Sequence, residues 1–110
     1  MRAPPEILQI VERLLSALEE LGVKIEAAYL FGSYARGDWL HTSDVDLVVV
    51  SKGFEGMRWL DRLDLVAKVQ LRLGLGKWVE VLPYTPEEFA EALERSVVLK
   101  DASKYWVRVK

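Results

Sequence analysis

The sequence predicts an α+β fold in which a small mixed β-sheet is flanked by helices, and it predicts one domain over residues 1–110. Three long segments place apolar residues at the spacing of a single helix face. Between them lie short runs of apolar and β-branched residues, which are typical of strands. Because the two patterns alternate along the chain, the helices are expected to cover a sheet. A chain of this length can build one such core.

The helices are expected over residues 5–21, 57–73 and 85 to at least 93–95. Pro5 suits the first position of a helix, and Gly22 supplies a stop for the first helix. Gly74 ends the second helix in the same way. The third helix has the clearest start, because Thr85 can cap its first turn while Glu88, three residues later, completes a capping box.

Strands are expected over residues 23–31, 45–50, 78–82 and 105–109, with a short helix over 34–36. The 45–50 segment is almost wholly apolar apart from its aspartate, which is typical of a buried central strand. Helices and strands should therefore alternate through the whole chain, beginning with a helix.

Composition excludes several classes of site. The chain has no cysteine, so disulfides, thiolate metal sites and cysteine nucleophiles are absent. No apolar run approaches the ~20 residues that span a membrane, and the N-terminus lacks a signal-peptide pattern, so we expect a cytoplasmic protein without a membrane partner. The net charge of −2 disfavours nucleic acid as a partner. The chain has no asparagine, a bias that resembles thermophile composition.

Two aspartates, Asp44 and Asp46, stand where the 45–50 strand begins. Alternate side chains of a strand point the same way, with Cα atoms about 6.5 Å apart. Both carboxylates can therefore converge on divalent ions, and oxygen ligands alone suit Mg²⁺ or Mn²⁺ better than zinc. The alternative is that they mark only the solvated start of a strand, although the apolar run that follows makes an unpaired acid costly there.

A glycine–serine pair, Gly32-Ser33, ends one predicted strand and precedes a predicted helical turn. Glycine lets the backbone approach a ligand closely, and free N–H groups at a helix start favour phosphate. Ser33 adds a hydroxyl and Arg36 a positive charge. Taken alone, the pair is better explained as an ordinary turn with Arg36 in water.

The two motifs in combination carry more information. Gly-Ser-x-x-Arg-Gly over residues 32–37, followed by Ser-Asp-x-Asp over residues 43–46, resembles the DNA polymerase β-like nucleotidyltransferase superfamily. The chain looks most like the minimal nucleotidyltransferases, small proteins that are often paired with a HEPN-domain partner in toxin–antitoxin operons. The resemblance covers the whole chain in outline and is specific over residues 30–49.

The resemblance implies a polymerase β-like fold and a metal-dependent transfer of NMP, with ATP as the default donor, to a hydroxyl acceptor. It implies a third carboxylate on a neighbouring strand, which here is Glu80, although aspartate is more common at that place. The implied catalytic and metal-binding residues are Asp44, Asp46 and Glu80, with two Mg²⁺ or Mn²⁺ ions. The implied nucleotide-binding residues are Gly32, Ser33, Arg36 and Ser43.

The resemblance further implies that the acceptor is a tyrosine of a HEPN-domain partner, which makes this chain an antitoxin. A non-catalytic antitoxin module that binds nucleotide and partner stays open as the alternative. Glu80 has its own alternative as a surface residue of an edge strand.

Other features have structural explanations that we favour. Trp39 and His41 are expected to pack or to be exposed rather than to stack on a base. The solvated charges are expected to include Arg58, Arg62, Arg72, Lys100, Lys104, Arg108 and Lys110, with docking of an acidic partner as the alternative. Residues 105–107 could form a sticky edge for a partner helix or a homo-oligomer.

Overall fold

A computed structural model describes residues 3–110, and its centre is a four-stranded mixed sheet with the strand order β3-β2-β1-β4. The strands are β1 (Ala27–Phe31), β2 (Val45–Val50), β3 (Val79–Tyr84) and β4 (Val107–Arg108). β2 runs antiparallel to β1 and parallel to β3, and β4 pairs antiparallel with β1. The predicted fold class, a small mixed sheet flanked by helices, is confirmed.

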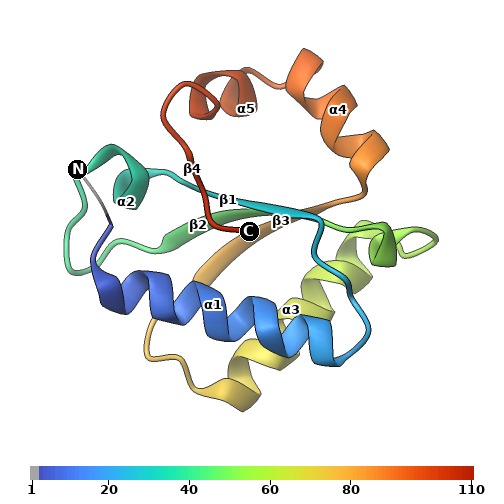
Figure 1. The fold of residues 1–110 in the computed structure, drawn as a ribbon, viewed down its shortest axis with the longest axis horizontal. Coiled ribbons are helices and arrows are strands. Elements are labelled where there is room, and N and C mark those ends of the chain that lie inside the picture. Colours follow the sequence, from blue (N-terminus) through green and yellow to red (C-terminus); the bar gives the residue numbers. More distant parts are fainter. Residues whose placement is uncertain (1–2) are drawn as a thin grey trace.

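Helices cover both faces of this sheet (Figure 1). On one face lie α1 (Pro5–Glu20) and α3 (Trp59–Leu73), and the main core forms between them and the strands. On the other face lie α4 (Pro86–Arg95) and α5 (Val97–Ala102), over a smaller cluster around Val48, Val50 and Leu99. Alternate residues of β2 supply the two clusters, so that strand is buried on both faces, as predicted.

The short helix α2 (Ser33–Arg36) follows β1 directly, close to the predicted bounds. A 3-10 turn, η1 (Lys52–Phe54), follows β2 and was not predicted. Within residues 3–110, no helix is long and apolar enough to cross a membrane.

The first predicted strand was too long, because the structure begins β1 at Ala27 rather than at residue 23. Val23 and Ile25 are buried, so their alternation with charged residues reflects packing against the core and not strand pairing. The carbonyl of Lys24 accepts a hydrogen bond from the Ser51 hydroxyl. A side chain therefore satisfies this backbone group without a neighbouring strand.

The remaining differences lie at element ends. Helix α3 begins at Trp59, two residues later than predicted, and the last strand is limited to Val107–Arg108. Strand β3 continues through Pro83 to Tyr84. Proline is tolerated there because β3 is an edge strand with a partner on one side only. Helix α5 was missed, and the Ser96 hydroxyl caps it by accepting a hydrogen bond from Leu99 N.

Arg62 is the clearest correction among the charged residues, since it was expected on a solvated face. It is only 5% exposed. Its guanidinium forms a two-pronged ion pair with Glu88 and also donates to the carbonyls of Met57 and Pro83. Arg62 therefore ties α3 to the start of α4, where the predicted capping box between Thr85 and Glu88 is present.

Candidate functional site

The three predicted carboxylates lie at one end of the two parallel strands. Asp44 immediately precedes β2, Asp46 is the second residue of β2, and Glu80 is the second residue of β3. The register pairs Asp46 directly with Glu80. Each of these two is flanked by buried apolar residues that belong to the α1/α3 core, so both acids face the other side of the sheet.

Gly32 brings the end of β1 against the Asp46 side chain. The register sets Phe31 opposite Asp46, so the next residue lies beside the same carboxylate. A Cβ atom at Gly32 would overlap the Asp46 carboxylate and would lie 2.9 Å from its Cγ. Gly32 also has φ +73°, a conformation that other residues rarely adopt. Only glycine therefore permits this approach of the Gly-Ser segment to the acid.

Negative charges outnumber positive charges around Asp46. Burial raises the pKa of the Asp46 carboxyl, the negative charges of Asp44 and Glu80 raise it further, and Arg36 lowers it. Asp46 is half-buried, whereas Asp44 and Glu80 are exposed. Within residues 3–110, none of the three carboxylates accepts a hydrogen bond or forms an ion pair that would offset this repulsion. A bound cation would relieve it.

The donor set suits a divalent ion, although the acids are not drawn together into a closed cluster. Across the part of the chain that the structure describes, no three histidine or acidic side chains form a ready metal-binding group. All-oxygen donors, one of them half-buried and electrostatically coupled to the others, fit Mg²⁺ or Mn²⁺. The types of donor present are therefore those that the implied metal prefers.

Arg36 reaches toward this site from the end of α2. Its guanidinium donates from Nε to Asp38 Oδ2 at 3.3 Å and from Nη1 to the Tyr105 hydroxyl at 3.2 Å. Both hydrogen bonds raise the pKa of Arg36, and the one to Tyr105 contributes most. The sequence predicted Arg36 but not its contact with Tyr105, because nothing local links residues so far apart in the chain.

The loop that carries Asp44 is braced by Lys77, which the sequence reasoning also missed. Lys77 Nζ donates to the carbonyls of His41 and Ser43, at 2.8 and 2.9 Å. The Ser43 hydroxyl accepts a hydrogen bond from Leu40 N within the same loop, so in this structure it stabilises the turn. The only sequence signal for Lys77 is its position just before the strand that carries Glu80.

Trp39, which was expected to pack or to be exposed, packs against a neighbouring ring. Trp39 is half-buried and stacks on Tyr34, with ring centroids 5.6 Å apart. The Lys77 ammonium lies 5.7 Å from the centre of the Tyr34 ring. His41 is exposed.

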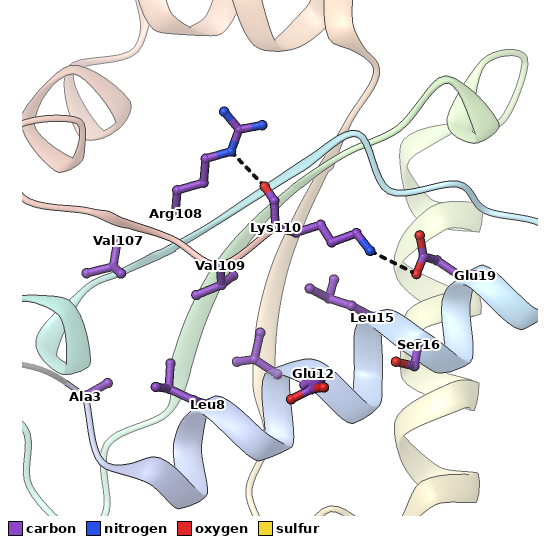
Figure 2. A pocket seen from close by; sticks show the side chains of 11 residues that line it. Ala3, Leu8, Glu12, Leu15, Ser16, Glu19, Val107, Arg108, Val109 and Lys110 are labelled. Atoms are coloured by element: carbon purple, nitrogen blue, oxygen red, sulfur yellow. Dashed lines mark hydrogen bonds and ion pairs between the residues drawn. The ribbon is translucent and has the colours of Figure 1, made fainter.

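A pocket of about 560 Å³ lies elsewhere, between α1 and the C-terminal strand (Figure 2). Leu8, Leu15 and Val109 line its apolar side, and Lys110 Nζ reaches Glu19 Oε1 at 3.4 Å across one end. None of the three carboxylates lines it. It belongs to the β4 edge of the sheet, opposite the β3 edge that carries Glu80.

Comparisons with known proteins identify the family of this chain. The family model described as "Nucleotidyltransferase domain" matches residues 11–105. An inferred protein adenylyltransferase of Methanocaldococcus jannaschii is 41% identical over 78 residues, which are 71% of this chain and 77% of that protein. The crystal structure of an inferred nucleotidyltransferase from Sulfolobus solfataricus superposes with a TM-score of 0.54 at 31% identity, covering 78% of this chain and 69% of that one.

Two crystal structures of toxin–antitoxin proteins share the fold at lower identity. One, solved with AMP-PNP, has a TM-score of 0.61 at 21% identity, and the other, a mutant of the MntA–HpeT pair, has 0.60 at 19%. Each match covers 90% of this chain and 71% of the other. The family match spans residues 11–105, which is most of the chain. This chain is a nucleotidyltransferase and belongs to the nucleotidyltransferase domain family.

Proposed function

We propose that this chain transfers AMP from ATP to a hydroxyl group of a partner protein, with Asp44, Asp46 and Glu80 as its catalytic and metal-binding residues. The proposal rests above all on one observation: the Asp46 carboxylate lies in register with Glu80 on one side and is closely approached by Gly32 on the other. A nucleotide whose phosphates lie along the Gly-Ser segment therefore meets the carboxylates directly.

Each residue has a separate task in this proposal. Gly32 admits the phosphates close to the backbone, and the Ser33 hydroxyl and Arg36 guanidinium donate hydrogen bonds to them. Ser43 completes the nucleotide-binding set from the loop before β2. Asp44, Asp46 and Glu80 would hold two Mg²⁺ or Mn²⁺ ions, which supply charge neutralisation on the phosphates and activation of the acceptor hydroxyl. Glu80, on the exposed edge strand, lies where an acceptor can approach.

ATP and a protein acceptor are supported by the relatives. The relative that is 41% identical carries the name of a protein adenylyltransferase, and one structural neighbour holds AMP-PNP. Both low-identity neighbours come from toxin–antitoxin pairs. We therefore propose a HEPN-domain toxin as the partner and its tyrosine hydroxyl as the acceptor. The net charge of −2 argues against a nucleic-acid acceptor.

The test is transfer of label from α-labelled ATP, with Mg²⁺, to a protein in a lysate of the source cells. The Asp44→Asn/Asp46→Asn double variant keeps the side-chain shapes and removes both charges, and Asp61→Asn, an exposed change on α3, is the matched control. We expect one labelled protein with the wild type and with Asp61→Asn, and none with the double variant. Label that persists in the double variant would reject the assignment of these acids.

The second candidate is a non-catalytic antitoxin module that binds nucleotide and partner. It is favoured by the exposure of Asp44 and Glu80 and by the open arrangement of the acids in residues 3–110. This candidate requires nucleotide binding without transfer, and tight binding of the partner by the Asp44→Asn/Asp46→Asn variant.

A further inference from the structure

A tyrosine near the C-terminus, Tyr105, contacts Arg36, the arginine that follows the Gly-Ser segment. The Tyr105 hydroxyl accepts a hydrogen bond from Arg36 Nη1 at 3.2 Å, although 69 residues separate the two in the chain. The guanidinium carbon also lies 5.5 Å from the centre of the Tyr105 ring, within the range of a cation–π contact. Two different interactions therefore join the same pair of side chains.

Tyr105 is itself held in place by the sheet. Its backbone N–H donates to the carbonyl of Ala102 at 3.0 Å. The next residue, Trp106, stacks on Tyr29 of β1 with ring centroids 4.4 Å apart. Strand β4 then pairs with β1. Because β1 leads directly into Gly32 and α2, one strand positions both Tyr105 and Arg36.

The contact leaves Arg36 able to bind a further anion. Its guanidinium uses one donor for Asp38 and one for Tyr105. The other N–H donors have no acceptor among residues 3–110. Arg36 is the last residue of α2, which begins directly after Gly32, so its charge lies within one helical turn of the Gly-Ser segment. An exposed arginine loses considerable rotamer freedom when it binds phosphate, and a contact that orients it beforehand reduces this cost.

We propose that Tyr105 is a positioning residue that orients the Arg36 guanidinium for the phosphates of the nucleotide. This inference rests on the proposed function, in which Arg36 binds those phosphates. The Tyr105 ring supports the guanidinium through its π face, and its hydroxyl sets the direction of the remaining N–H donors. The hydroxyl itself takes no part in the transfer.

The test measures equilibrium binding of ATP and of adenosine to the full chain and to Tyr105→Phe, which removes the hydroxyl and keeps the ring. Loss of one hydrogen bond to a charged, exposed group should weaken ATP binding about three- to tenfold. Binding of adenosine, which has no phosphates, should not change. Tyr84→Phe is the matched control, because Tyr84 is half-buried like Tyr105, lies at the end of β3, and has no hydrogen bond or cation–π contact with Arg36.

A double-variant cycle makes the inference falsifiable. In an Arg36→Ala background, Tyr105→Phe should weaken ATP binding no further. An equal loss in both backgrounds, an unchanged Kd for ATP, or tighter ATP binding by Tyr105→Phe would overturn the inference. A purely structural role would lower the unfolding midpoint and leave the ratio of the ATP and adenosine Kd values unchanged, which would also overturn it.

Failure of this inference differs from failure of the proposed function. If the wild type binds ATP and Arg36→Ala weakens binding while Tyr105→Phe does not, only the role of Tyr105 is lost. If the wild type binds no ATP at all, the proposed function fails with it.

Discussion

Substitution of Gly32 by alanine tests the geometry of the site at its tightest point. Two costs follow from the structure. The first is conformational, because Gly32 has φ +73° and ψ −157°, a region used almost only by glycine, which costs other residues about 1–3 kcal/mol. The second is steric, because the new Cβ would overlap the Asp46 carboxylate. The Asp46 side chain can rotate away, so this overlap should move the acid rather than unfold the protein.

Gly56→Ala separates the two costs. Gly56 also has a positive φ, +79°, but a Cβ atom there would meet nothing within 4 Å. Both variants should lose about 1–3 kcal/mol of unfolding free energy in urea titrations followed by tryptophan fluorescence. Only Gly32→Ala should lose nucleotidyl transfer, by roughly 100-fold, because a displacement of about 1 Å at a catalytic group has an effect of that size. Transfer at the wild-type rate by a folded Gly32→Ala protein would show that the close approach of Gly32 to Asp46 has no role in transfer.

Three further changes have defined outcomes. Burial, and after it the charges of two neighbouring carboxylates, raise the pKa of Asp46 in the folded, metal-free protein. The unfolding free energy of the protein should therefore fall as the pH rises from 3.8, the ordinary pKa, through the raised pKa. Asp46→Asn should therefore be more stable than wild type above that window and no more stable below it, in urea titrations with a chelator; equal stability at neutral pH would contradict this. Arg62→Leu should lower the unfolding free energy by about 2–3 kcal/mol, because it leaves Glu88 and two backbone carbonyls without their hydrogen-bond donor. A smaller loss than that of the surface control Arg58→Leu would reject the tie between α3 and α4. Thr85→Ala should cost about 1 kcal/mol through loss of the α4 cap, measured by thermal unfolding, and an unchanged midpoint would show that the cap contributes nothing.

Much of the fold could be predicted because local patterns determine it. The apolar stripe of α1, the capping box of α4 and the apolar run of β2 each fix an element from neighbouring residues alone. The predicted strand over residues 23–31 failed at its start because burial and strand pairing give the same alternation. Only the partner strand distinguishes them, and β2 pairs with β1 from Ala27 onward.

For the candidate site, the sequence could predict only the residues that lie in short motifs. Gly32, Asp44 and Asp46 lie in two short motifs, and a parallel neighbour strand was enough to bring Glu80 beside them. The supporting residues depend on contacts between distant segments. Lys77 holds the Asp44 loop across 34 residues, and the Tyr105 contact with Arg36 spans 69, so no local pattern could have shown either.

Contacts between distant segments also explain why the burial of Arg62 was not predicted. A charged residue on a predicted helix is ordinarily placed in water, because burying an unpaired charge is costly. The structure removes this cost with Glu88 and two carbonyls from outside α3. The start of α4 supplies that carboxylate, and the sequence does not show that Glu88 lies within reach of α3.

We propose that the Asp44, Asp46 and Glu80 site transfers a nucleotide and not a phosphate. The most direct measurement incubates the protein and its acceptor with Mg²⁺ and with ATP labelled either at the α or at the γ phosphate, beside the Asp44→Asn/Asp46→Asn variant. We predict that the acceptor gains label from α-labelled ATP only, and only with the intact aspartates. Label from γ-labelled ATP, or α label that persists without the aspartates, would show that these acids do not catalyse nucleotidyl transfer.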